Sequence, residues 1–99
     1  MAERDPRAFV APAGWVVADG RLHRVFKFID FAEAFAFMTR VAAEAERLDH
    51  HPDWSNAWNT VTIDLTSHDE KGLTDRDRQL AEAINAVQGG PRAGEVSDR

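Results

Sequence analysis

The 99-residue sequence contains no cysteine. Disulfide-stabilised scaffolds, thiol nucleophiles and zinc sites built from cysteine are therefore excluded. No apolar run approaches the roughly 20 residues that span a bilayer. The opening segment, MAERDPRAFV, also lacks the apolar stretch of a signal peptide. We therefore expect a cytoplasmic protein that does not enter a membrane.

Positive charge is scarce as well. The chain has 12 lysines and arginines against 17 aspartates and glutamates, which gives a net charge of −5. Binding to nucleic-acid phosphates requires a basic patch, and binding to anionic membranes requires a basic amphipathic helix. The basic residues here are scattered and no glycine-rich phosphate loop is present. We expect neither nucleic acid nor membrane as a partner, which leaves small molecules and proteins.

The length suits a single domain with a thin core. Hydrophobic residues make up 43% of the chain, but many of them are alanine. A domain of this size buries a modest share of its surface, so a second copy covering an apolar face would add stability. We interpret residues 1–13 as a loosely held lead-in, 14–88 as the domain and 89–99 as a disordered tail.

The first half of the domain predicts a hairpin followed by a helix. Asp19-Gly20 separates two apolar-containing runs, 15–18 and 21–28, and this pair favours a type I′ β-turn. Asp30 is a good helix N-cap, with Glu33 at the third helical position to complete a capping box. The helix is expected to run from Phe31 to about Leu48, because Pro52 pushes the preceding residue out of the helical region.

One apolar stripe is expected along this helix, from residues spaced by three and four. Its members are Phe31, Phe35 (or Ala34), Met38, Ala42, Ala45 and Leu48. Phe37 and Val41 lie beside the stripe, where they either widen it or contact another subunit.

The second half predicts two strands and a second helix. A short strand is expected at 54–58, a turn at Asn59, and a half-buried strand at 60–66, where polar and apolar residues alternate. Thr74 caps a helix with Asp77 three residues on, and Gly89-Gly90 ends it. Its apolar stripe contains Leu80, Ala83, Ile84 and Val87. The order ββαββα predicts an α+β two-layer fold, with a four-stranded antiparallel sheet and both helices packed on one face.

Three of the four histidines lie where chain segments end. His50 and His51 stand between the first helix and Pro52, and His68 follows a strand. Imidazole is the side chain best suited to moving protons near neutral pH. This arrangement therefore favours a proton-transfer site. The alternative is that His50 stabilises the helix C-terminus as a cation, while His51 and His68 are ordinary surface residues.

Other interpretations of these residues stay open at this stage. Three histidines can hold zinc, but adjacent histidines rarely aim both rings at one ion and no HExxH spacing is present, so we expect no metal. Glu46, four residues before His50, either orients that imidazole or is a solvated helix-end residue. Trp54 and Trp58 are either core or interface aromatics, or a stacking wall for a flat heterocycle.

The motif around the histidines resembles one family. The segment Glu46-Arg47-Leu48-Asp49-His50-His51-Pro52-Asp53-Trp54, then Trp58-Asn59, His68 and Gly72-Leu73-Thr74-Asp75-Arg76-Asp77, is similar to pterin-4a-carbinolamine dehydratases. Gly14-Trp15 and the stretch from Phe35 to Ala42 extend the likeness, which covers about residues 14–87. The full spacing is far more specific than the His-His-Pro triplet alone.

The resemblance implies a lyase that removes water from 4a-hydroxytetrahydropterin and gives quinonoid dihydropterin. This step recycles the tetrahydropterin cofactor of aromatic amino acid hydroxylases. The resemblance also implies that no metal or organic cofactor is needed, and that subunits form homodimers across sheet edges or homotetramers packed through helices. Two alternatives belong to other classes: a non-catalytic, dimerising protein-interaction module of the same fold, and a histidine-metal hydrolase that a chelator would inactivate.

The resemblance also assigns roles to individual residues. His50 and His68 would be the proton donors, and His51, the third catalytic histidine, would mainly hold the pterin. The residues expected to support the imidazoles or to line the substrate pocket are Glu46, Asp49, Trp15, Arg76 and Asp77.

Overall fold

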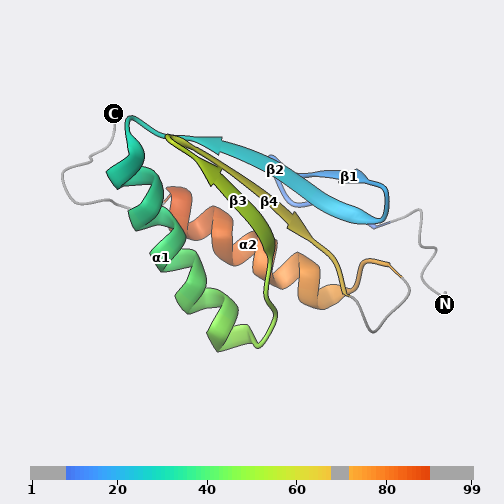
Figure 1. The fold of residues 1–99 in the computed structure, drawn as a ribbon. Coiled ribbons are helices and arrows are strands. Elements are labelled where there is room, and N and C mark those ends of the chain that lie inside the picture. Colours follow the sequence, from blue (N-terminus) through green and yellow to red (C-terminus); the bar gives the residue numbers. More distant parts are fainter. Residues whose placement is uncertain (1–8, 68–71, 90–99) are drawn as a thin grey trace, which may run out of the picture.

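The computed structural model describes residues 9–67 and 72–89 (Figure 1). Its elements are β1 (Val16–Ala18), β2 (Arg21–Lys27), α1 (Phe31–Leu48), β3 (Asp53–Ala57), β4 (Thr60–Leu65) and α2 (Asp75–Gly89). The strands form one antiparallel sheet in the order β1-β2-β4-β3. Both helices lie on the same face of that sheet (Figure 1). The predicted ββαββα fold is confirmed. The lead-in and tail predicted at the two ends fall mostly outside the described residues.

The first hairpin turns where the Asp-Gly pair predicts it. Asp19 has φ 54° and Gly20 has φ 75°, and a type I′ turn needs positive φ at both positions. β2 then pairs with β4 from Leu22↔Leu65 to Lys27↔Thr60. After β2 the chain forms α1, then the edge strand β3, and then β4, which returns to the centre of the sheet beside β2.

The core lies between the sheet and the helices. Val61, Ile63 and Leu65 of β4 are fully buried, as the alternation in that strand predicts. Leu22 and Phe26 of β2 join them from the neighbouring strand. On α2 the predicted Leu80 and Ile84 are fully buried, whereas Ala83 and Val87 are half-buried and Ala81 occupies the core instead. None of the helices in the described ranges is long and apolar enough to cross a membrane.

The ends of α1 follow the predicted signals. The Asp30 side chain accepts a hydrogen bond from the Glu33 N–H at 2.9 Å. The Glu33 carboxylate in turn accepts the Ile29 N–H at 2.9 Å. The first bond satisfies an N–H that the start of a helix leaves without a partner, and the second ties the residue before the cap to the first turn. The helix ends at Leu48, as Pro52 predicts.

The buried face of α1 differs from the predicted stripe. Ala34, Phe37, Val41 and Ala45 face the core. Phe37 is fully buried, and its ring lies 4.8 Å from that of Phe26 and 4.9 Å from that of Phe28. By contrast, Phe31, Phe35 and Ala42 are exposed. The predicted stripe was therefore wrong at Phe31 and Ala42, and of the two options Phe35 and Ala34 only Ala34 is buried. An alanine-rich helix with three phenylalanines is apolar around much of its circumference, so periodicity alone allows more than one stripe.

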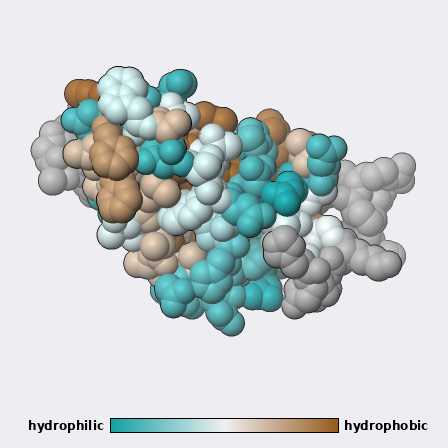
Figure 2. Space-filling view, in the orientation of Figure 1, coloured by the Kyte–Doolittle hydropathy of each residue, from teal (hydrophilic) through white to brown (hydrophobic). Residues whose placement is uncertain are grey.

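The phenylalanines that miss the core form an apolar surface at the start of α1. The rings of Phe31 and Phe35 stack at 5.8 Å, and Ile29, two residues before Phe31 in the chain, is 77% exposed. The Trp58–Asn59 turn is tied to the same end, because the Phe28 N–H bonds the Asn59 carbonyl at 2.9 Å. Trp58 is 66% exposed there. We call Ile29, Phe31, Phe35 and Trp58 the end patch; Figure 2 shows hydrophobic surface gathered at this end of the molecule.

Candidate active site

The site begins with the turn that ends α1. Asp49 adopts the left-handed conformation, with φ 52° and ψ 45°. Its N–H bonds the Glu46 carbonyl at 3.2 Å, and the His50 N–H bonds the Ala45 carbonyl at 3.0 Å. This pattern is a Schellman motif, which reverses the chain after a helix. The turn carries His50 inward, to 7% exposure, and leaves His51 exposed.

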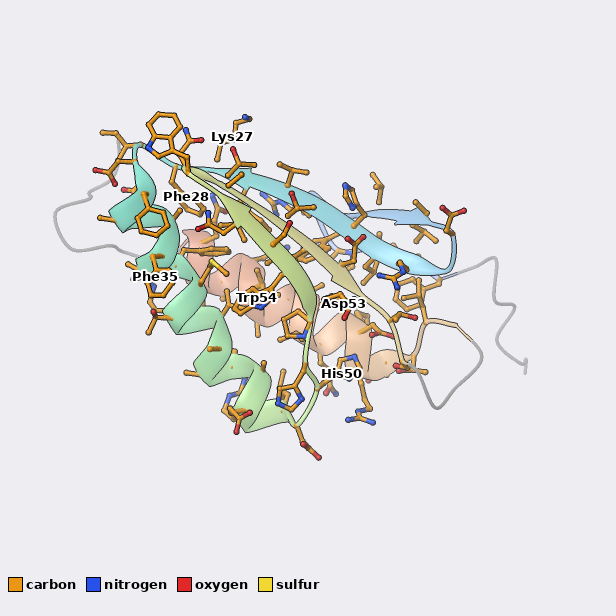
Figure 3. The ribbon with its side chains drawn as sticks, in the orientation of Figure 1. Lys27, Phe28, Phe35, His50, Asp53 and Trp54 are labelled. Carbon is orange, nitrogen blue, oxygen red and sulfur yellow. The ribbon has the colours of Figure 1, made fainter. Side chains whose placement is uncertain are left out.

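His50 meets a buried carboxylate from α2. Its Nε2 atom lies 2.6 Å from Oδ1 of Asp77, which is fully buried. Figure 3 shows His50 where the end of α1 leads into β3, at the opposite end of α1 from Phe35. The two residues are 27 positions apart in sequence, so the packing of α2 beside α1 creates the pair.

Asp77 is held by the first turn of α2. The Thr74 N–H donates to Oδ2 of Asp77 at 2.9 Å, and the Arg76 N–H donates to the Thr74 hydroxyl at 3.2 Å. Thr74 therefore caps α2 as predicted, with Asp77 three residues on. The N-terminal end of a helix also favours a negative charge, so the location suits an ionised carboxylate.

Sequence reasoning missed Ser67, which completes the surroundings of Asp77. Its hydroxyl donates to Oδ2 of Asp77 at 2.9 Å and lies 2.8 Å from the Thr74 hydroxyl. Ser67 is 2% exposed. A signal was present in the sequence, because Ser67 continues the inward alternation of Val61, Ile63 and Leu65.

A second imidazole–carboxylate pair lies on the surface beside the first. Nε2 of His51 is 2.7 Å from Oε2 of Glu46, and both side chains are largely exposed. One interpretation of the sequence placed Glu46 against His50. The structure pairs it with His51 instead, because the helix ends at Leu48 and the turn swings His50 away from the helix surface.

Arg76 links the two helix ends at this site. Its Nη2 atom donates to the carbonyl oxygen of Asp49. Besides His50, five of the other seven predicted site residues lie at this junction or beside it: Glu46, Asp49, His51, Arg76 and Asp77. His68 lies outside the described residues, so its position is not part of this geometry.

Trp15 makes its contacts elsewhere. The residue is buried, and its indole N–H donates to Oδ1 of Asn85 at 2.8 Å. Its ring meets Phe26 edge-on at 6.0 Å. Asn85 lies eight residues beyond Asp77 on α2, which is about 12 Å along a helix. Among the described contacts, the hydrogen bonds of Trp15 therefore do not join the His50 network.

Arg24 shares the Asn85 anchor with Trp15. Its guanidinium donates to Oδ1 of Asn85 at 2.8 Å and lies 4.4 Å from the centre of the Phe26 ring. Burial lowers the pKa of Arg24, although a guanidinium stays protonated at any ordinary pH. Asn85 also donates to the Ala13 carbonyl at 2.9 Å. This cluster fastens the segment before β1 to the domain.

The two remaining tryptophans have different surroundings. Trp54 is half-buried and packs against the core, which supports its interpretation as a core aromatic. Trp58 belongs to the exposed end patch and has φ 52°. Within residues 9–67 and 72–89, no group of three histidine, aspartate or glutamate side chains is arranged to hold a metal ion.

The arrangement as a whole suits proton transfer. A buried carboxylate holds one nitrogen of His50, and such a contact fixes the orientation and tautomer of an imidazole. No hydrogen-bond partner is found for the Nδ1 atom of His50 in the described part of the chain. That part also contains no buried side-chain nitrogen or oxygen without a partner. Among the described residues, His50 is therefore held through Nε2, and its neighbour in the chain, His51, is exposed.

Comparison with known proteins places this chain among relatives of one kind. A family model described as pterin 4 alpha carbinolamine dehydratase matches residues 2–87. A protein of Prochlorococcus marinus (strain MIT 9303) is 60% identical over 77 residues, which cover 78% of this chain and 80% of the relative. A protein of Synechococcus sp. (strain WH7803) is 59% identical over 87 residues, covering 88% and 92%. Both are named provisionally as pterin-4-alpha-carbinolamine dehydratases.

Two solved structures share the fold. One is the crystal structure of a transcriptional coactivator/pterin dehydratase from Brucella melitensis, with a TM-score of 0.74 and 47% identity over 78% of this chain and 84% of that chain. The other is a pterin dehydratase-like protein identified as a RuBisCO assembly factor in the alpha-carboxysome. Its TM-score is 0.62 at 27% identity, over 70% of this chain and 80% of that chain. With the family model matching most of its length, this chain belongs to the pterin-4-alpha-carbinolamine dehydratase family.

Proposed function

We propose that this protein is a cytoplasmic lyase that dehydrates 4a-hydroxytetrahydropterin to quinonoid dihydropterin and water. The reaction would return the cofactor of aromatic amino acid hydroxylases to its recycling route. The observation that carries the proposal is the buried His50–Asp77 pair at 2.6 Å, beside an exposed His51, in a member of this family. A pure scaffold has no need of such a pair.

The proposed chemistry needs an acid more than any other group. Hydroxide leaves poorly, so His50 gives a proton to the 4a-hydroxyl as the carbon–oxygen bond breaks and water departs. The adjacent ring nitrogen supplies the electron pair that forms the C=N bond. The pterin then releases a proton, so the net loss is one water and the histidine is restored. General acid help of this kind contributes typically 10²–10⁴-fold.

The other residues have supporting roles in this proposal. His51, oriented by Glu46, holds the pterin at the surface beside His50. Arg76 keeps Asp49 and the turn after α1 against α2. His68 is the second proton donor and Trp15 braces the pocket; these two assignments follow from the family resemblance.

The test is stopped-flow absorbance of 4a-hydroxytetrahydropterin decay. We expect wild type to accelerate the decay, and His50→Ala combined with His68→Ala to abolish the acceleration. His23→Ala is the matched control, because His23 also contacts an aspartate, Asp64, at 2.9 Å, but lies on β2, outside the site. If wild type only matches the uncatalysed decay, the enzyme proposal fails.

A second candidate is a non-catalytic interaction module. Two observations favour it: the structural relative identified as a RuBisCO assembly factor, and the exposed end patch. Wild-type decay at the uncatalysed rate, with a folded protein, would select this candidate. A metal-dependent hydrolase is a weaker alternative, and loss of activity on treatment with a chelator would be needed to support it.

We also propose that the protein forms a homodimer or homotetramer. The end patch leaves Phe35 55% exposed on the surface of α1, and β3 is an edge strand able to pair with a second sheet. Sedimentation velocity of the wild type and of the double variant Phe31→Ser, Phe35→Ser would test this. The double variant should sediment as a smaller assembly, with a lower molecular mass than the wild-type oligomer. Val25→Ser, at another exposed apolar residue, is the control expected to leave the mass unchanged. A monomeric wild type would refute self-association.

A further inference from the structure

Only one assignment of donors and acceptors is consistent with all the hydrogen bonds around Asp77. The Ser67 hydroxyl gives its single hydrogen to Oδ2 of Asp77. The contact between Ser67 and Thr74 must therefore use the hydrogen of Thr74. The Thr74 hydroxyl in turn accepts the Arg76 N–H. Every hydrogen in this chain of bonds points toward Asp77.

This direction determines which nitrogen of His50 carries hydrogen. Oδ2 of Asp77 accepts two bonds, from the Ser67 hydroxyl and the Thr74 N–H. Its Oδ1 atom faces Nε2 of His50 at 2.6 Å. Because an ionised carboxylate can only accept, Nε2 must donate. The Nδ1 atom, for which the described residues provide no hydrogen-bond partner, is then the nitrogen that gains or loses a proton.

We propose that Ser67 and Thr74 are positioning residues that act through Asp77 to hold His50 as the Nε2–H tautomer, so that Nδ1 exchanges the proton with the pterin. The proton exchange between Nδ1 and the pterin rests on the proposed function. The hydrogen-bond network and the tautomer of His50 are properties of the protein without substrate. The two parts can therefore be tested separately.

The first experiment measures the tautomer without any substrate. Long-range ¹H–¹⁵N correlation spectra of ¹⁵N-labelled protein distinguish the two ring nitrogens of a neutral histidine, and the His50→Ala variant assigns the signals. Wild type should show hydrogen on Nε2 of His50. A predominant Nδ1–H signal would overturn the proposal, whether or not the protein is an enzyme.

Asp77→Asn is the most discriminating variant, because the network predicts the orientation of the new side-chain amide. The amide oxygen must accept from Ser67 and Thr74, which leaves the NH₂ group facing Nε2 of His50. Nε2 then becomes the acceptor, and the hydrogen moves to Nδ1. We expect this reversal in the spectrum, with a loss of dehydration rate of about 10²-fold or more. An Nε2–H tautomer retained in the folded variant would contradict the proposed direction.

The role of Ser67 is tested by kinetics. Ser67→Ala removes one hydrogen bond to a charged group, and we expect kcat to fall about tenfold with KM nearly unchanged. Ser67→Thr keeps the hydroxyl and should restore most of the rate. Ser55→Ala makes the same chemical change on exposed β3 and should have no effect.

The outcomes separate the two proposals. If wild type shows the Nε2–H tautomer and Asp77→Asn reverses it, but neither protein dehydrates the pterin, the proposed function fails and the network stands. If wild type is active and Ser67→Ala keeps the wild-type kcat, the positioning role of Ser67 is refuted and the function stands. Lower stability of Ser67→Ala without a change in kcat would also refute it, because that result describes a purely structural residue.

Discussion

The buried face of α1 can be tested by comparing two phenylalanines that are two residues apart. Phe37→Ala removes a fully buried ring that packs against Phe26 and Phe28. Truncating a buried phenylalanine costs about 3–5 kcal/mol. Phe35→Ala removes a ring that is 55% exposed, and surface substitutions of this kind change stability by about 0.5 kcal/mol. The two variants differ chemically in nothing but position.

Urea unfolding followed by tryptophan fluorescence measures both costs. A small domain has about 5–15 kcal/mol of stability in total, so the loss in Phe37→Ala should be a large fraction of it. Each kcal/mol corresponds to about 4–8 °C in Tm for a domain of this size, so Phe37→Ala should melt roughly 12 °C or more below wild type. Phe35→Ala should stay within a few degrees.

Self-association adds a second observable to this comparison. If the end patch binds a second copy, the effect of Phe35→Ala grows with protein concentration, whereas that of Phe37→Ala is present at every concentration. Measurements over a wide range of dilution therefore separate the two contributions. Equal losses for both variants at high dilution would refute the assignment of Phe37 to the core and of Phe35 to the surface.

Three further predictions concern the ends of segments, and each can be checked by urea or thermal unfolding. Asp30→Ala removes the α1 cap and should cost about 1 kcal/mol; a cost near zero would mean that the cap contributes nothing. Gly14→Ala should cost about 1–3 kcal/mol, because Gly14 has φ 86° and an added Cβ would collide with the Arg24 guanidinium; wild-type stability would contradict this packing. Asp49→Ala should be about 1 kcal/mol less stable than Asp49→Gly, since Asp49 is left-handed; equal stabilities would argue against that conformation.

Local structure was predictable because its causes are local. The Asp19-Gly20 turn needs positive φ at two adjacent residues, and the α1 start needs a short acceptor at Asp30. Both requirements are visible in a few neighbouring side chains. The alternation that leads into β4 likewise records which residues face the core. Its continuation to Ser67 was present in the sequence, but a buried serine has no meaning until its partner is known.

The face of α1 was not predictable in the same way. Alanine fits a core or a surface, so phenylalanines at positions 31, 35 and 37 allow more than one buried stripe. The sheet decides between them, because β2 presents Phe26 with Phe28 just beyond its end, and Phe37 fits against both. Packing shape rather than periodicity selects the face.

The candidate site likewise combines features that local sequence specifies with contacts that only tertiary packing creates. By itself the sequence determined the element order, the helix caps and the histidine motif, because short-range sterics and hydrogen bonds specify them. Only the tertiary structure paired His50 with Asp77, gave Glu46 to His51, brought Ser67 to the carboxylate and bonded Trp15 to Asn85. These contacts join residues that are distant in the chain or turned by the end of a helix. They exist because α2 packs beside α1 on one face of the sheet.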